Sequence, residues 1–262
     1  MAEKMTSDKP VLVLLHGWGV NQGVWQSVAQ QLERQPEDQP EDMVQLLTPD
    51  LPGFGLCREY PQPYQLDAVV DILAAQIPAQ SYVCGWSLGG LLAIALAHRY
   101  PHKVNQLGLI AASPCFLAQH NWPGMAETIM QQFARSLSEN LPLTIERFLA
   151  IQAMGSSTAR ADIKVLKQAI MAYPMADANA VEGALQLLKA DLRTEFAALT
   201  QPVSGFFGRL DSLVPVKVTD LLQQLQPQGR FSIAAHASHA PFISHQDEFM
   251  HWLRQWLSPA FN

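Results

Sequence analysis

The stretch that decides the fold is GWSLGG (85–90), which follows the apolar run SYVC and precedes the helical run LLAIALAHRY. A G-x-S-x-G sequence between a strand and a helix is typical of a nucleophile elbow, a sharp turn that presents a serine side chain. The serine backbone is strained there, and Gly85 and Gly89 supply the small residues that a close strand–helix approach requires. Ser87 would then lie at a helix N-terminus, whose N–H groups favour a developing oxyanion.

Short apolar runs alternate with amphipathic helical patterns on both sides of this turn. The expected strands are VLVLL (11–15), MVQLLTPDL (43–51), SYVCGW (81–86), NQLGLIAAS (105–113), PVSGFFGRLD (202–211) and RFSIAAHAS (230–238). The expected helices include VWQSVAQQLERQ (24–35), LDAVVDILAAQI (66–77), KVTDLLQQL (217–225) and HQDEFMHWLRQWL (245–257). Strands that alternate with helices predict βαβ units, and so an α/β fold with a mostly parallel central sheet flanked by helices.

The pattern changes between residues 116 and 192, where no long β-like run occurs. This segment is expected to form several helices, broken at Pro142, Gly155, Pro174 and Gly183. It is too long for a loop. We therefore predict an inserted helical cap, or lid, at 116–192, between two parts of one α/β core at 1–115 and 193–262. The cap should cover the carboxyl ends of the strands, where open α/β sheets bind ligands.

Composition narrows the class of protein further. The chain has 262 residues, 48% of them hydrophobic, and a net charge of −6 without any Lys/Arg block. These values are typical of a globular protein and argue against nucleic acid or an anionic membrane as the main partner. The spacing of Cys57, Cys84 and Cys115 fits neither a disulfide framework nor a zinc site, so we expect core packing in a reducing compartment.

No targeting or metal-binding signal stands out. The first apolar run, 11–15, is too short for a signal peptide or a membrane span. The sequence has no HExxH motif, no paired CxxC and no EF-hand loop. We expect a cytoplasmic monomer that needs no metal and no cofactor.

A nucleophilic serine needs a base, and the base needs an orienting carboxylate. When the serine lies on such an elbow, the acid and then the histidine follow it along the chain. Asp211 ends the late strand GFFGRLD, so it is the predicted acid. Asp191 lies before that strand and Asp220 within a helical pattern, so both are expected to be surface charges.

The predicted base is His239, which lies in ASHAP, in the loop after the last strand. His236, at the end of that strand, is the alternative. His245 begins the final helix and His251 lies within it, so both are less well placed to reach the elbow.

A second oxyanion donor should come from the turn after an early strand. HGWG (16–19) follows VLVLL directly, which would bring the Trp18 N–H beside the Leu88 N–H. His16 is expected to hold this loop rather than to catalyse. Because position 87 is serine, the aspartate nucleophile of some enzymes with this architecture is excluded.

Taken together, these motifs resemble the α/β-hydrolase superfamily over the whole chain. More narrowly, the chain resembles the pimeloyl-[acyl-carrier-protein] methyl ester esterases of biotin synthesis. The stretches that carry the resemblance are LVLLHGWGVNQGVW, DLPGFG, GWSLGGLLA, SPCF, NWPGM, TIERFLAIQAMGSSTAR, GALQLLKADLR, GRLDSLVP and SHAPFISH. HGxG, DLPGFG and GxSxGG occur throughout the superfamily, whereas ERFLAIQAMG in a helical cap is much less common.

The resemblance implies hydrolysis of a methyl ester on a pimeloyl chain carried by acyl carrier protein, without a cofactor. It implies Ser87 as nucleophile, Asp211 as orienting acid and His239 as base, with Trp18 and Leu88 on the oxyanion side. It places the acyl channel along Phe148, Leu149, Ala150, Ile151 and Gln152. It also implies carrier contacts by Arg147, Arg160 and Lys164. One position departs, because Leu143 stands where the family can have a further arginine.

Three other functions use the same fold. A general short-chain carboxylesterase would share every catalytic residue and differ only in having no use for a basic cap face. A catalytically silent binding protein would usually lack a triad member, and this chain keeps all three. An acyltransferase or perhydrolase would use the same triad with another acceptor in place of water.

The cap segment 147–167 has a local charge of +3. Arg160, Lys164 and Lys167 are spaced i, i+4 and i+7, so a helix would present them on one face; we call these three residues the basic stripe. Two interpretations are open. The stripe is either an ordinary solvated helix face or a surface that steers an acidic carrier protein.

Overall fold

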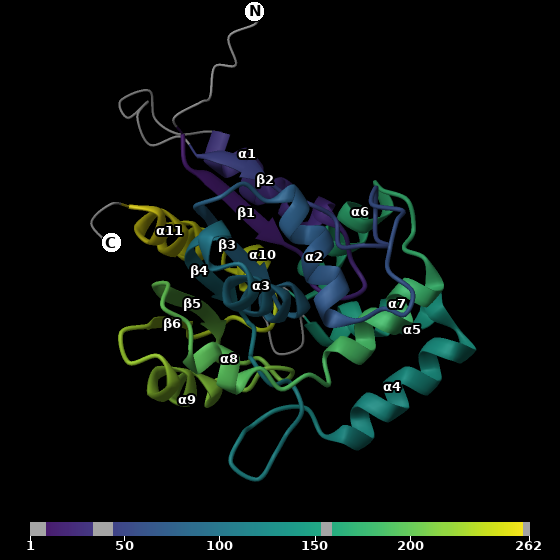
Figure 1. Cartoon of the computed structure of the whole chain (residues 1–262). Coiled ribbons are helices and arrows are strands. Elements are labelled where there is room, and N and C mark those ends of the chain that lie inside the picture. The colour runs from purple at the N-terminus through teal and green to yellow at the C-terminus, as the bar shows by residue number, and fades with distance from the viewer. Residues whose placement is uncertain (1–8, 34–43, 153–158, 259–262) are drawn as a thin grey trace, which may run out of the picture.

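The computed structural model describes residues 9–33, 44–152 and 159–258. Its centre is a six-stranded sheet in the order β2-β1-β3-β4-β5-β6, and all neighbouring strands are parallel (Figure 1). The strands are β1 (Val11–Leu15), β2 (Gln45–Leu47), β3 (Ser81–Trp86), β4 (Val104–Ile110), β5 (Val203–Gly208) and β6 (Arg230–Ala234). The predicted α/β class with a parallel sheet is confirmed.

Helices cover both faces of the sheet because successive strand residues point to opposite sides. Val13 and Leu15 belong to a cluster with residues of α2 and α3, whereas Leu12 and Leu14 belong to a cluster with residues of α1 and α11. The bounds of these and the remaining core helices are α1 (Gln26–Glu33), α2 (Leu66–Gln76), α3 (Leu88–Arg99), α8 (Arg193–Ala197), α9 (Val218–Leu225), α10 (Pro241–Ser244) and α11 (Gln246–Leu257), with short 3-10 turns η1 (Gln22–Trp25) and η3 (Pro101–Lys103). No helix in the described ranges is long and apolar enough to cross a membrane.

Four further helices lie together beside the sheet: α4 (Glu127–Glu139), α5 (Leu141–Gln152), α6 (Ala159–Met171) and α7 (Ala178–Leu187) (Figure 1). The chain enters and leaves this cap at adjacent points, since Cys115 and Asp191 form an antiparallel bridge. The N–H of Leu192 also donates to the carbonyl of Pro114, with an N···O distance of 2.8 Å.

Hydrogen bonds connect one side of the cap to the core. The amide of Asn21 donates to the carbonyl of Ile170 at 3.0 Å, and the Arg58 guanidinium donates to the carbonyl of Met175 at 2.8 Å. The Asp177 N–H donates to the Gly53 carbonyl at 2.9 Å. The end of α6 and the start of α7 are therefore fixed on the core.

Of the predicted helix breaks, the one at Gly183 is wrong and the one at Gly155 lies outside the described residues. The break predicted at Pro142 is confirmed to within two residues, because α4 ends at Glu139 and Pro142 falls in the first turn of α5, where a missing N–H costs nothing. Gly183 lies inside α7, where its lack of a side chain admits Tyr64; a Cβ there would come within 2.4 Å of the Tyr64 Cβ. Pro174 does separate α6 from α7, and Gly155 is not among the described residues. The strand predicted at 43–51 is also shorter, because β2 ends at Leu47.

Candidate active site

Ser87 occupies the turn between β3 and α3 with φ 54° and ψ −119°. A positive φ is rare for a residue with a side chain and marks strain that the surroundings must hold. The Ser87 N–H donates to the carbonyl of Ile110 at 3.0 Å, which ties the turn to the end of β4. The side chain is 5% exposed at the N-terminus of α3. The strained strand–turn–helix geometry predicted for GWSLGG is thus present.

The two flanking glycines are needed because backbone fills the space where a side chain would be. A Cβ on Gly85 would come within 2.2 Å of the Gly89 carbonyl oxygen, and a Cβ on Gly89 within 2.4 Å of the Leu15 carbonyl oxygen. Both distances are far below van der Waals contact. The close approach of β3, α3 and the end of β1 therefore excludes any other residue at these positions without a shift of the backbone.

His239 and Asp211 form a buried pair. His239 Nδ1 lies 2.7 Å from Asp211 Oδ2, and both side chains are 1% exposed. Asp211 Oδ1 accepts from the N–H groups of Leu213 and Val214 at 2.8 and 2.9 Å, so the carboxylate is fixed in position. In a neutral ring whose Nδ1–H donates to this carboxylate, the other ring nitrogen keeps its lone pair.

That second nitrogen, His239 Nε2, is buried and makes no hydrogen bond within the described part of the chain. Trp86, the residue before the serine, fixes the position of the histidine backbone, because its indole N–H donates to the His239 carbonyl at 2.8 Å. The Trp86 and His239 rings lie 5.9 Å apart between centroids. One residue, Trp86, therefore connects the backbone of the predicted nucleophile with that of the predicted base.

The rejected candidates lie elsewhere. Asp220 is exposed on α9, and Asp191 pairs with Arg193 at the surface. His236 and His251 are exposed, and His245 bonds to Ser244 at the start of α11. Each of these groups lies in water or has a local partner. Asp191 and Asp220 are at the surface as predicted, and His236, the alternative base, is exposed as well.

The predicted oxyanion donors, the N–H groups of Trp18 and Leu88, donate to no backbone carbonyl in the described ranges. The Trp18 side chain is 1% exposed, and its indole N–H donates to the carbonyl of Val181 at 2.8 Å. A Cβ on Gly17 would lie 3.3 Å from the Ser87 Cβ, which shows that the 16–19 loop packs directly against the serine.

His16 holds this loop from the inside and is fully buried. Nδ1 lies 2.8 Å from the Gly17 carbonyl, and Nε2 accepts from the Leu51 N–H at 2.9 Å, so Nδ1 carries the proton of a neutral ring. Burial lowers the pKa of His16, opposed by the nearby Asp50 carboxylate. The ring acts as a neutral spacer between two loops.

The buried neutral His16 predicts a stability that falls in acid. The unfolded ring takes up a proton below its ordinary pKa of about 6.5, whereas the folded ring resists it, so this contribution is lost as pH falls, by at most about 1.4 kcal/mol per pH unit. We expect the wild type to have a higher free energy of unfolding than His16→Gln, as measured in urea. This difference should be larger at about pH 7.5 than at about pH 5.5. A difference independent of pH would contradict this account.

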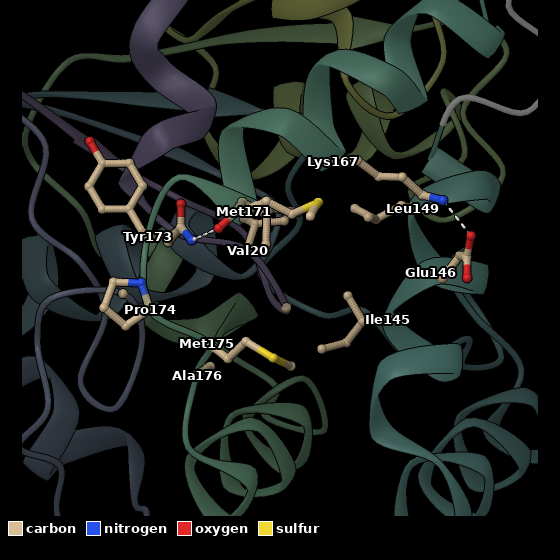
Figure 2. Close-up of a pocket in the computed structure, with 14 residues that line it drawn as sticks. Val20, Ile145, Glu146, Leu149, Lys167, Met171, Tyr173, Pro174, Met175 and Ala176 are labelled. Atoms are coloured by element: carbon tan, nitrogen blue, oxygen red, sulfur yellow. Dashed lines mark hydrogen bonds and ion pairs between the residues drawn. The ribbon is translucent and has the colours of Figure 1, made fainter.

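A cavity of about 450 Å³ lies between the cap and the core (Figure 2). The core contributes the loop at 19–21 and Gly55 to its wall. Residues of α5 form one side, and residues of α6 and of the segment 173–176 form the other. The lining residues are Gly19, Val20, Asn21, Gly55, Ile145, Glu146, Leu149, Lys167, Ile170, Met171, Tyr173, Pro174, Met175 and Ala176. The walls are mostly apolar, so this cap cavity suits a chain-like apolar ligand.

The structure divides the predicted acyl-channel residues. Phe148 is buried with its ring 4.9 Å from that of Trp18, and Leu149 lines the cap cavity. Ala150 is exposed, because a helix cannot turn consecutive residues to one side. Ile151 and Gln152 end α5, but their side chains lie outside what the structure describes.

Sequence reasoning missed two parts of this region. Phe133 of α4 packs on Trp18 with centroids 5.2 Å apart, and the apolar residues after α6 form a wall of the cap cavity. The amphipathic pattern of α4 could have indicated Phe133. The loop residues carried no signal, since their role depends on the fold of the whole cap.

The basic cap residues are at the surface. Arg147 on α5 and Arg160 and Lys164 on α6 are exposed, and α5 packs against α6. Lys167 differs from the rest of the basic stripe because it forms an ion pair with Glu146 across the two helices. Leu143 is 39% exposed on α5.

The described residues hold no cluster of three His, Cys, Asp or Glu side chains suited to a metal ion. All three cysteines are free; Cys84 and Cys115 are buried and Cys57 is half-buried. Burial raises the pKa of the Cys84 thiol, which keeps it protonated within the sheet.

The family described as alpha/beta hydrolase fold matches residues 10–246. This chain belongs to that family. Solved α/β structures agree in fold: an esterase from Exiguobacterium antarcticum (EaEST) has a TM-score of 0.81 at 18% identity and covers 96% of this chain and 92% of its own. The enol-lactonase from Burkholderia xenovorans LB400 has a TM-score of 0.78 at 20% identity, with 97% and 93% covered.

This α/β hydrolase is more closely similar to a named group of enzymes. It is 47% identical over 244 residues to the pimeloyl-[acyl-carrier protein] methyl ester esterase of Pseudoalteromonas atlantica (strain T6c / ATCC BAA-1087), covering 92% of each chain. It is 42% identical over 248 residues to the enzyme of the same name from Aliivibrio fischeri (strain MJ11), covering 94% and 93%. Both alignments take in nearly the whole length, cap included.

Proposed function

We propose that this α/β hydrolase is a carboxylic ester hydrolase that cleaves the methyl ester of pimeloyl-[acyl-carrier protein], releasing methanol, in the cytoplasm and in the course of biotin synthesis. The observation that carries the proposal is the near full-length similarity to esterases of that name, together with the buried His239–Asp211 pair beside the strained Ser87 turn. The similarity supports the substrate, and the geometry supports the chemistry.

Catalysis would proceed by two acyl transfers. His239 Nε2 removes the proton from Ser87 Oγ, which attacks the ester carbonyl, while Asp211 stabilises the imidazolium that forms. The N–H groups of Trp18 and Leu88 stabilise the oxyanion, an interaction worth about 3–4 kcal/mol per donor. His239 then protonates the departing methoxide to methanol, and water cleaves the acyl-enzyme by the same route.

The carrier protein would dock on the exposed faces of α5 and α6. Arg147, Arg160 and Lys164 offer three exposed positive charges there, which suits an acidic partner. Glu146 offsets the charge of Lys167, so the surplus of positive charge is smaller than the +3 of segment 147–167 suggested. Leu143 offers the carrier an apolar contact in place of a further charge. We expect the docking to be weakly held and sensitive to salt.

Charge reversal at Arg160 and Lys164 tests the carrier contact. In an Arg160→Glu/Lys164→Glu variant, the KM for the carrier-bound methyl ester should rise several-fold and its dependence on salt should flatten, because steering by the cap is lost. Mass spectrometry of the carrier before and after reaction gives the rates, and a small free ester is the control substrate. Equal losses on both substrates would indicate a damaged cap. No loss on either would favour a general short-chain esterase.

A further inference from the structure

One charged pair interrupts the apolar wall of the cap cavity. Lys167 Nζ and Glu146 Oε1 form an ion pair that bridges α6 and α5, and both side chains line the cavity (Figure 2). Asn21, which also lines the cavity, has its oxygen occupied by the Gly23 N–H and its amide N–H by the Ile170 carbonyl. Lys167 and Glu146 are therefore the charged groups that a ligand entering the described part of this cavity would meet.

The pair is placed where surface and cavity meet. The Lys167 and Glu146 side chains are 41% and 57% exposed, so water reaches both. Lys167 is also the last residue of the basic stripe, one helical turn beyond Lys164. Positive charge thus runs along α6 from the exposed docking face to the edge of the cavity.

The pair can open at little cost. Exposed ion pairs contribute little to stability, because water and salt screen them and two long side chains must be held. The hydrogen bond from the Lys167 ammonium holds the pKa of Glu146 below its ordinary value, so the Glu146 carboxylate is charged at neutral pH. A stronger or additional anion at the edge of the cavity could replace Glu146 as the partner of Lys167, and Glu146 would return to water.

We propose that Lys167 binds the phosphate of the carrier's phosphopantetheine arm, with Glu146 holding the ammonium in place until the arm arrives. This inference rests on the proposed function, since it names the group of that substrate which meets Lys167. An arm attached at the basic face and directed toward Ser87 carries its phosphate at the carrier end and its apolar acyl chain at the other. The cap cavity has the matching order, with charge at its edge and apolar walls within.

Lysine suits this task as a point charge that follows a phosphate in several orientations. The acyl end of the arm would then pass between α5 and the core loop at Gly19, which lies next to Trp18 in the chain. Lys167 would be a positioning residue, because it touches the arm and not the reacting ester.

The test compares three methyl pimeloyl thioesters that differ only in the carrier end: on pantetheine, on phosphopantetheine, and on the acyl carrier protein. Methanol release measures turnover. For Lys167→Gln, we expect KM to rise about tenfold on the phosphopantetheine thioester, as for one lost charge-assisted contact, with kcat unchanged. On the pantetheine thioester, which lacks the phosphate, KM should stay at the wild-type value.

A second variant, Glu146→Gln, separates phosphate binding by Lys167 from a merely structural ion pair. If the pair only joins α5 to α6, both variants lose it and behave alike. If Lys167 binds phosphate, Glu146→Gln removes its competitor, so KM on phosphopantetheine should fall below the wild-type value while Lys167→Gln raises it. Lys189→Gln is the matched control, because Lys189 is an exposed cap lysine outside the cavity lining.

Three outcomes decide the question. Opposite shifts for the two variants, confined to substrates that carry phosphate, support the proposal. Equal KM changes on pantetheine and phosphopantetheine, or no change on either, overturn it even if the wild type turns over the carrier-bound ester. Failure of the wild type to release methanol from that ester would instead refute the proposed function itself.

Discussion

Ser87→Ala should fold like the wild type and lose about 10⁴-fold or more in kcat. The substitution removes one oxygen and keeps the Cβ, so the strained turn with φ 54° and its bond to the Ile110 carbonyl are unchanged. Only the attacking atom is lost. Hydrolysis of a p-nitrophenyl ester measures the effect, with thermal unfolding as the check on folding. A rate within about tenfold of the wild type would show that another residue is the nucleophile.

Asp211→Asn should lower kcat by a factor on the order of 10⁴ while leaving the local structure in place. The asparagine oxygen can still accept from the N–H groups of Leu213 and Val214. Its amide would then face His239 Nδ1 and donate to it. The ring proton moves to Nε2, so the histidine can no longer accept the proton of Ser87.

Asp220→Asn is the control for this prediction. Asp220 is exposed on α9, and its replacement should be nearly silent in the same assay. If Asp220→Asn abolished activity and Asp211→Asn did not, the assignment of the acid to Asp211, in the turn after β5, would be wrong.

The sheet was predictable because each of its strands is signalled locally. β1 and β3 match the predicted runs at both ends, since buried apolar stretches closed by glycine or a polar loop have few other solutions. The partners Asp211 and His239 could be selected by their order along the chain, and the structure brings them within 2.7 Å. Their catalytic roles stay predictions that the substitutions above will test.

Features that depend on neighbours distant in the chain were not predictable. A glycine such as Gly183 usually indicates a helix break, but here it lies inside α7, where Tyr64 occupies the space that a side chain would fill. Ala150 belongs to a contiguous motif, yet the helical rotation of α5 leaves it exposed. The partner of Lys167 lies 21 residues away on another helix, and spacing within α6 alone suggested only a solvated or docking face.

The paired entry and exit of the cap have an evolutionary consequence. Because Cys115 and Asp191 lie side by side, the two ends of the intervening segment are as close together as those of a short loop, whatever the segment contains. Residues can be gained, lost or exchanged between them without altering the register of β4 and β5. Natural variation can therefore remodel what the enzyme accepts while Ser87, Asp211 and His239 remain on an unaltered frame. The same two positions are the splice points at which a cap from another lineage could be grafted onto this core.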